Sequence, residues 1–133
     1  MAKLDEQIKT MAGYFAADCE ADGRLSLVLE VEHFITCSDG RAADFAAVQA
    51  AVQDMQQQAD APIILDGTYM GYSGLAASVT VGPACQLCLT LAAQRDVQDM
   101  MDLYNRLYLQ MGLALAAHGL RAWALGCHPV SYT

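Results

Sequence analysis

The feature that most constrains the fold is a run of extended segments that follow one another closely along the chain. Residues 62–65, 76–81 and 85–91 are short and apolar, and glycine and proline flank them, which is typical of strands. Parallel neighbours need a crossover of about a dozen residues or more, whereas antiparallel neighbours can be joined by short turns. Consecutive strands therefore favour antiparallel pairing. We expect the glycine- and tyrosine-rich residues 66–74 to form a loop.

The remaining segments alternate helix and strand. Apolar side chains recur at helical spacing in the first segment, which Asp22-Gly23 ends, and again at 42–58 and at 95–118. Residues 24–36 and 120–127 have strand character. The predicted order is α-β-α-β-β-β-α-β in one domain, residues 1–133. We expect a two-layer α+β fold, with a mainly antiparallel sheet of about four to six strands and three helices packed on it.

Composition excludes several classes of partner. The net charge is −8 and the seven basic residues are scattered, which argues against nucleic acid. No stretch of about eighteen apolar residues is present, so we expect no membrane span. The start of the chain is charged and helix-like rather than a secretory signal, which favours a cytoplasmic protein with reduced thiols. Because 55% of the residues are hydrophobic, we expect self-association as a homodimer or higher homo-oligomer.

Cys85 and Cys88 form a Cys-x-x-Cys sequence that could indicate a metal or redox site. The segment has strand character, and residues three apart in a strand point to opposite faces. We therefore expect two separate thiols. A zinc or redox module remains an alternative, in which Cys85 or Cys88 would combine with Cys127 and His128.

Glu30 and Glu32 are two carboxylates on one face of the segment RLSLVLEVEHFIT, residues 24–36. Neighbouring carboxylates repel each other, and divalent cations such as Mg²⁺ relieve that repulsion. A solvated polar face of the sheet is the alternative interpretation. His33 falls on the opposite, leucine-rich face, where we expect a partly buried, hydrogen-bonded side chain.

Three stretches in order resemble the bacterial glutamate–cysteine ligases. VLEVEHF at 28–34 is similar to the first active-site strand of that family. The segment SVTVGPACQLCLTLAAQRDVQDMMDLYNRLYLQ at 78–110 resembles its strand, proline turn, second strand and long helix. The stretch HGLRAWALGCHP at 118–129 resembles the strand after that helix, which ends in Gly-x-His-Pro.

The resemblance implies the N-terminal part of a glutamine-synthetase-like catalytic domain, whose antiparallel sheet forms a bowl for ATP, Mg²⁺ and amino-acid substrates. It implies metal ligands at Glu30 and Glu32 and substrate-binding positions at Gln86 and Cys88. Two family glutamates are replaced, by Gly82 before the proline and by Cys88 on the later strand. A thiol is a poor ligand for a hard cation.

We therefore expect a shortened glutamate–cysteine ligase-like protein without full ligase activity of its own, with an amino acid as its possible small-molecule ligand. The alternative is an ATP- and Mg²⁺-dependent ligase of glutathione precursor synthesis that another chain or segment completes.

Overall fold

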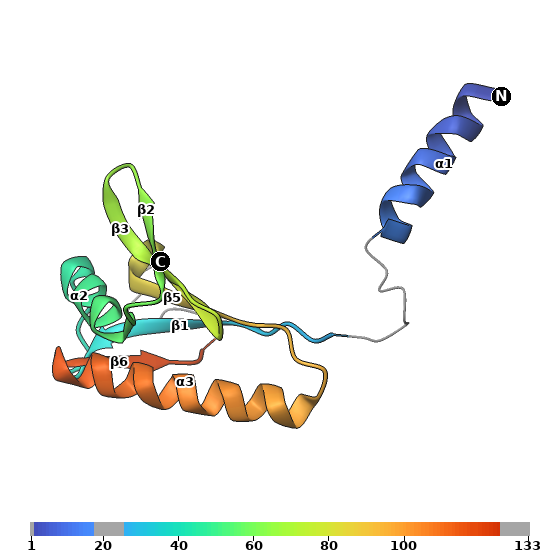
Figure 1. The fold of residues 1–133 in the computed structure, drawn as a ribbon. Coiled ribbons are helices and arrows are strands. Elements are labelled where there is room, and N and C mark those ends of the chain that lie inside the picture. Colours follow the sequence, from blue (N-terminus) through green and yellow to red (C-terminus); the bar gives the residue numbers. More distant parts are fainter. Residues whose placement is uncertain (1, 18–25, 126–133) are drawn as a thin grey trace.

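The structure, a computed structural model, describes residues 2–17 and 26–125 (Figure 1). It has three α-helices and a six-stranded sheet, and so confirms the predicted α+β class. In chain order the elements are α1 (Ala2–Ala17), β1 (Glu30–Cys37), α2 (Phe45–Met55), β2 (Ala61–Leu65), β3 (Thr68–Ser73), β4 (Ala77–Gly82), the short 3-10 turn η1 (Pro83–Cys85), β5 (Gln86–Leu91), α3 (Val97–Ala117) and β6 (Leu120–Trp123).

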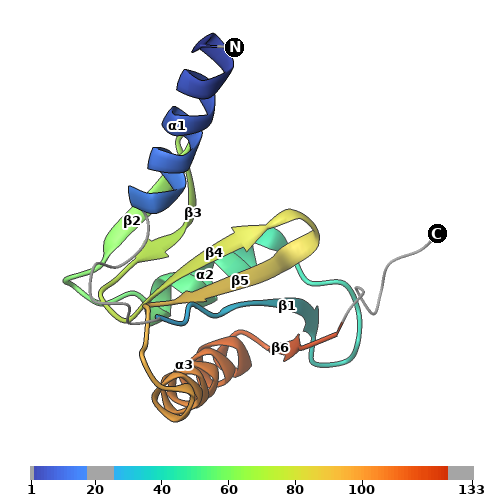
Figure 2. The ribbon, with the colours of Figure 1, turned by 90° about the vertical axis from the view of Figure 1, so that its right-hand side faces the viewer.

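The strands lie in the order β2-β3-β4-β5-β1-β6, and every neighbouring pair is antiparallel. Strands β2 to β5 form a meander, as the close spacing of the segments predicts. Strand β1 lies between β5 and β6, both of which come much later in the chain; Figure 2 shows these three strands side by side. The register pairs Glu32 with Cys88 and Phe34 with Gln86.

The prediction of a loop over residues 66–74 was wrong, because Thr68–Ser73 is strand β3. Asp66 and Gly67 alone make the turn from β2, both with positive φ angles, of 47° and 77°. Gly71 is required by packing: its φ is 139°, and an added Cβ would lie 1.9 Å from the carbonyl oxygen of Val79. Its neighbourhood also contains a register shift between β2 and β3. The glycine indicates a close approach of strands, not a turn.

Helices α2 and α3 pack against each other and cover one face of the sheet. Asp44 and Asp96 cap their N-termini by accepting hydrogen bonds from backbone N–H groups of the first turn. The core between the layers consists of apolar side chains from α2, α3 and alternate positions of the strands, among them Ile35, Val48, Val79, Leu87, Leu89, Met111 and Leu115.

Helix α1 differs from the expectation that all three helices pack on the sheet. Its described side chains, residues 3–16, are all exposed. The helix stands apart from the other two in Figure 1. Its predicted apolar stripe is present but uncovered, and large side chains such as Ile8 and Phe15 are more than half exposed.

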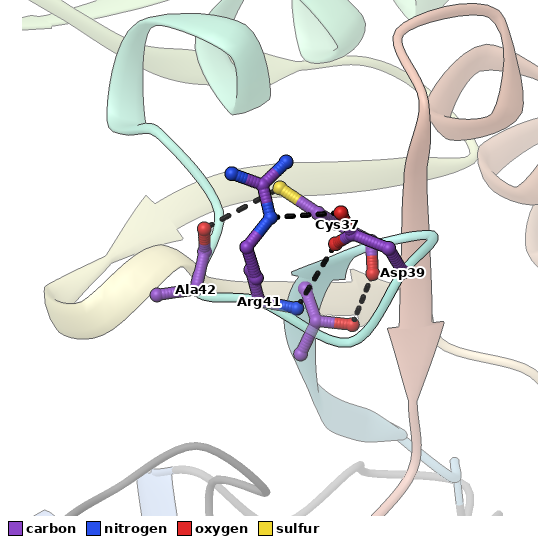
Figure 3. A network of polar contacts seen from close by, with 5 residues as sticks. Cys37, Asp39, Arg41 and Ala42 are labelled. Atoms are coloured by element: carbon purple, nitrogen blue, oxygen red, sulfur yellow. Dashed lines mark hydrogen bonds and ion pairs between the residues drawn. The ribbon is translucent and has the colours of Figure 1, made fainter.

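A polar turn reverses the chain between β1 and α2 (Figure 3). The Asp39 carboxylate accepts hydrogen bonds from the backbone N–H and the Nε of Arg41, at 3.1 and 2.7 Å. This hydrogen-bonded guanidinium lowers the pKa of Asp39. The Cys37 thiol donates to the carbonyl of Ala42 at 3.4 Å. The turn leads directly to the Asp44 cap of α2.

The predicted strand over 120–127 is shorter in the structure, where β6 spans Leu120–Trp123. The end of the predicted segment lies outside the described residues. No helix within residues 2–17 or 26–125 combines the length and apolar character needed to cross a membrane.

Candidate functional site

The face of the sheet opposite α2 and α3 has polar side chains at its centre. Strand β5 alternates between fully buried leucines and the half-buried Gln86, Cys88 and Thr90, so the second set faces away from the helices. On the neighbouring strand β1, Glu30 lies opposite Thr90 and Glu32 lies opposite Cys88. We call these five residues the acidic face. The prediction that Glu30 and Glu32 share one face of their strand is confirmed.

Two diagonal hydrogen bonds connect the paired strands of the acidic face. The Nε2 of Gln86 donates to the Oε2 of Glu32 at 2.5 Å, and the Sγ of Cys88 donates to the Oε1 of Glu30 at 3.3 Å. The Sγ of Cys88 also lies 3.8 Å from the Oγ1 of Thr90. Each carboxylate is therefore held by one side chain of β5, and both carboxylates keep further lone pairs for a ligand.

Cys88 acts as a hydrogen-bond donor in this arrangement. Burial raises the pKa of its thiol, and the hydrogen bond to Glu30 and the charges of Glu30 and Glu32 raise it further. A thiol beside negatively charged carboxylates stays protonated at neutral pH, whereas a nucleophilic cysteine has to be a thiolate. The Cys88 thiol is therefore suited to donate hydrogen bonds and is poorly suited to act as a nucleophile.

The two glutamates are the residues that could hold Mg²⁺. Magnesium is often bound by one or two carboxylates together with water and substrate phosphates. Among the described residues, no group of three or more histidine, cysteine or acidic side chains could hold a metal ion. Two carboxylates alone do not complete the coordination of a metal ion. They suit a cation whose other ligands are water and substrate phosphates.

Cys85 and Cys88 are separate thiols, as predicted, but strand β5 begins at Gln86 and Cys85 lies in the preceding turn η1. Cys85 is buried at the end of the 3-10 turn, with a φ of 59°, and its thiol donates to the carbonyl of Ala43 at 3.4 Å. Both are free thiols. Cys127 and His128, the other members of the alternative zinc or redox site, lie outside the described residues.

Sequence reasoning did not single out Arg121 and Trp123 on β6, which extend the same face. The guanidinium carbon of Arg121 lies 4.5 Å from the centre of the Trp123 ring. The indole Nε1 donates to the Oγ1 of Thr36 at 3.0 Å, and Trp123 pairs with Phe34 of β1. The alternation of Arg121 and Trp123 with the helix-facing Leu120 and Ala122 was a signal that could have identified them.

His33 points to the helix side and has the predicted hydrogen bond, but it is fully buried rather than partly buried. Its Nε2 lies 3.1 Å from the Oη of Tyr104, and its ring lies against those of Tyr104 and Tyr108. Burial lowers its pKa, which favours the neutral imidazole. His33 therefore belongs to the core, behind the acidic face.

Comparisons of the chain with protein-family models, with curated protein sequences and with solved structures found no match.

Proposed function

We propose that this chain is a glutamate–cysteine ligase-like domain that binds a small amino acid on the acidic face and lacks complete ligase activity of its own. The observation that supports this proposal is the pairing of Glu30 and Glu32 with Gln86 and Cys88 on a sheet face that α2 and α3 leave open. The resemblance places the same four positions around the substrate bowl of that family.

The chemistry of the acidic face favours an amino acid as ligand. Two carboxylates provide charge-assisted acceptors for an ammonium group. Gln86 has an amide oxygen for a further donor. Arg121 on the neighbouring strand β6 lies opposite Thr36, four residues along β1 from Glu32, and is a cation that a carboxylate on this side of the sheet could reach. Complete phosphoryl transfer requires several groups that neutralise a triphosphate. Cys88 replaces a carboxylate that the family uses, so we propose binding without full catalysis.

Titration calorimetry with glutamate and with cysteine, each with and without Mg-ATP, tests this proposal. The wild-type chain should bind at least one of the two amino acids. Glu30→Gln and Glu32→Gln should each weaken binding at least tenfold, since a charge-assisted hydrogen bond contributes roughly 1.5–3 kcal/mol. Asp66→Asn at the β2–β3 turn is the matched control and should leave affinity unchanged. Absence of binding under all four conditions would contradict the proposal.

A second candidate is an ATP- and Mg²⁺-dependent ligase that another chain completes. The open lone pairs of Glu30 and Glu32 favour it, because Mg²⁺ can bind there together with phosphates. Addition of cell extract to the purified chain, with glutamate, cysteine and Mg-ATP, should then produce γ-glutamylcysteine at a rate above that of extract alone. The Glu30→Gln/Glu32→Gln double variant should not add to the rate. Equal rates for wild type and variant would argue against this candidate.

A further inference from the structure

Helix α1 has an apolar stripe with no covering surface in the described residues. Leu4, Ile8, Met11 and Phe15 recur at intervals of four, three and four residues, and each is more than half exposed. This spacing averages about 3.7 residues, close to the 3.6-residue turn of an α-helix, so the four side chains form one apolar stripe along the helix. Isolated helices shorter than about 12–15 residues are marginal in water, so packing of its apolar stripe would stabilise this helix of sixteen residues.

A groove of matching character runs along α3. A cavity of 460 Å³ lies between the start of β4 and the flank of this helix, and leucines make most of its wall. Leu103 and Leu107 form its floor on the core side, whereas Leu109 and Leu113 are 66% exposed on its outer side. Leu109 and Leu113 are four residues apart, so they extend along one side of the helix for a full turn.

The exposed areas are sufficient for a dimer. Aromatic side chains can bury roughly 150–250 Å² each and aliphatic ones somewhat less. Five side chains on α1, the four of the stripe and Tyr14, are more than half exposed and together offer about 500 Å². Two helices would together bury about 1,000 Å² of their own surface in a reciprocal exchange, and the groove surfaces that receive them would add to this area. Stable protein–protein interfaces bury about 1,200–2,000 Å².

Charge favours α1 as the occupant of the groove. Lys3 and Lys9 balance Asp5 and Glu6, so α1 is neutral and the whole net charge of −8 belongs to the rest of the chain. Contact between two acidic bodies would be repulsive, whereas a neutral helix meets an acidic body without that cost. The neutral polar side also argues against a lipid surface, because helices that lie on membranes usually have a basic polar side.

We propose that α1 of one copy docks in the α3 groove of a second copy, and that the second α1 returns the contact to form a symmetric dimer. Both surfaces are exposed at once within a single chain, which leaves each available to a partner. Each copy contributes both its helix and its groove, so the whole interface is isologous. A closed dimer with two equivalent helix–groove contacts results. This inference concerns a surface remote from the acidic face and does not depend on ligand binding.

Sedimentation velocity over a concentration series tests the dimer. The wild-type chain should be dimeric at micromolar concentration. Ile8→Glu on α1 and Leu109→Glu in the groove should each weaken association at least tenfold and retain the far-ultraviolet circular dichroism of the wild type. Ile64→Glu is the matched control, because Ile64 is 55% exposed on the edge strand β2 and lies outside the proposed contact.

A mixing experiment distinguishes exchange between copies from other arrangements. The Ile8→Glu chain keeps an intact groove and the Leu109→Glu chain keeps an intact α1, so an equimolar mixture should form mixed dimers through one helix–groove contact. The mixture should sediment faster than either variant alone. A monomeric wild type, a dimer that both variants leave intact, a dimer lost only in Ile64→Glu, or a mixture without mixed dimers would each overturn the proposal.

Discussion

Cys88 has a thiol in a position where two carboxylates oppose its ionisation. Burial is the main cause of its raised pKa, and the hydrogen bond to Glu30 adds to it. The Glu30→Gln substitution removes a negative charge, so the thiolate should become more accessible. We expect several-fold faster alkylation of Cys88 by iodoacetamide at pH 8, measured by peptide mass spectrometry.

The matched control for this prediction is Asp66→Asn, which removes a charge at the distant β2–β3 turn and should leave the rate unchanged. An unaltered rate in Glu30→Gln would show that the carboxylate does not influence the thiol.

The buried His33 should make stability depend on pH. Burial lowers the pKa of His33 in the folded state. Just below the ordinary value of 6.5, His33 is therefore protonated in the unfolded chain and still neutral in the folded chain. The free energy of unfolding should therefore fall as pH decreases from about 6.5 to the lowered folded value. Urea unfolding at several pH values measures this slope. His33→Gln should reduce the slope, and an unchanged slope in this variant would contradict the prediction.

At the scale of elements, the close approach of β3 and β4 depends on Gly71. An alanine there would place its Cβ against the backbone of Val79, at a φ that side chains rarely adopt. We expect Gly71→Ala to lower the free energy of unfolding by about 2–4 kcal/mol. Gly112→Ala is the control: no atom lies within 4 Å of an added Cβ in the middle of α3. It should raise stability by about 0.5–1 kcal/mol. Equal effects of the two substitutions would refute this role for Gly71.

Periodicity predicted most elements, because alternation and helical spacing are local properties of the chain. The pairing of Glu30 and Glu32 with the face of Gln86 and Cys88 was predictable from alternation together with the resemblance. Strand β3 was missed because Gly71 and its tyrosine neighbours are typical of loops, and the close contact with Val79 that requires glycine is a tertiary feature. The hydrogen bonds across the acidic face depend on register, which alternation alone does not determine.

For the molecule as a whole, net charge should oppose the proposed dimer. Each copy has a formal charge of −8 at pH 7. Salt screens repulsion between exposed charges, and the Debye length falls from about 30 Å at 0.01 M to about 3 Å at 1 M. Dimer affinity, measured by sedimentation at increasing sodium chloride, should therefore rise with salt. A fall in affinity would indicate that attractive ion pairs, rather than apolar burial, dominate the contact.

The position of β1 between β5 and β6 has a consequence during synthesis of the chain. Glu30 and its contact Cys88 are 58 residues apart, so at about 5–20 residues per second the ribosome needs roughly 3–12 s to deliver the partner strand. For that interval β1 is an apolar strand with unpaired edges. Charged residues within such strands oppose intermolecular pairing. We therefore expect Glu30 and Glu32 to oppose intermolecular pairing of this strand before the acidic face exists.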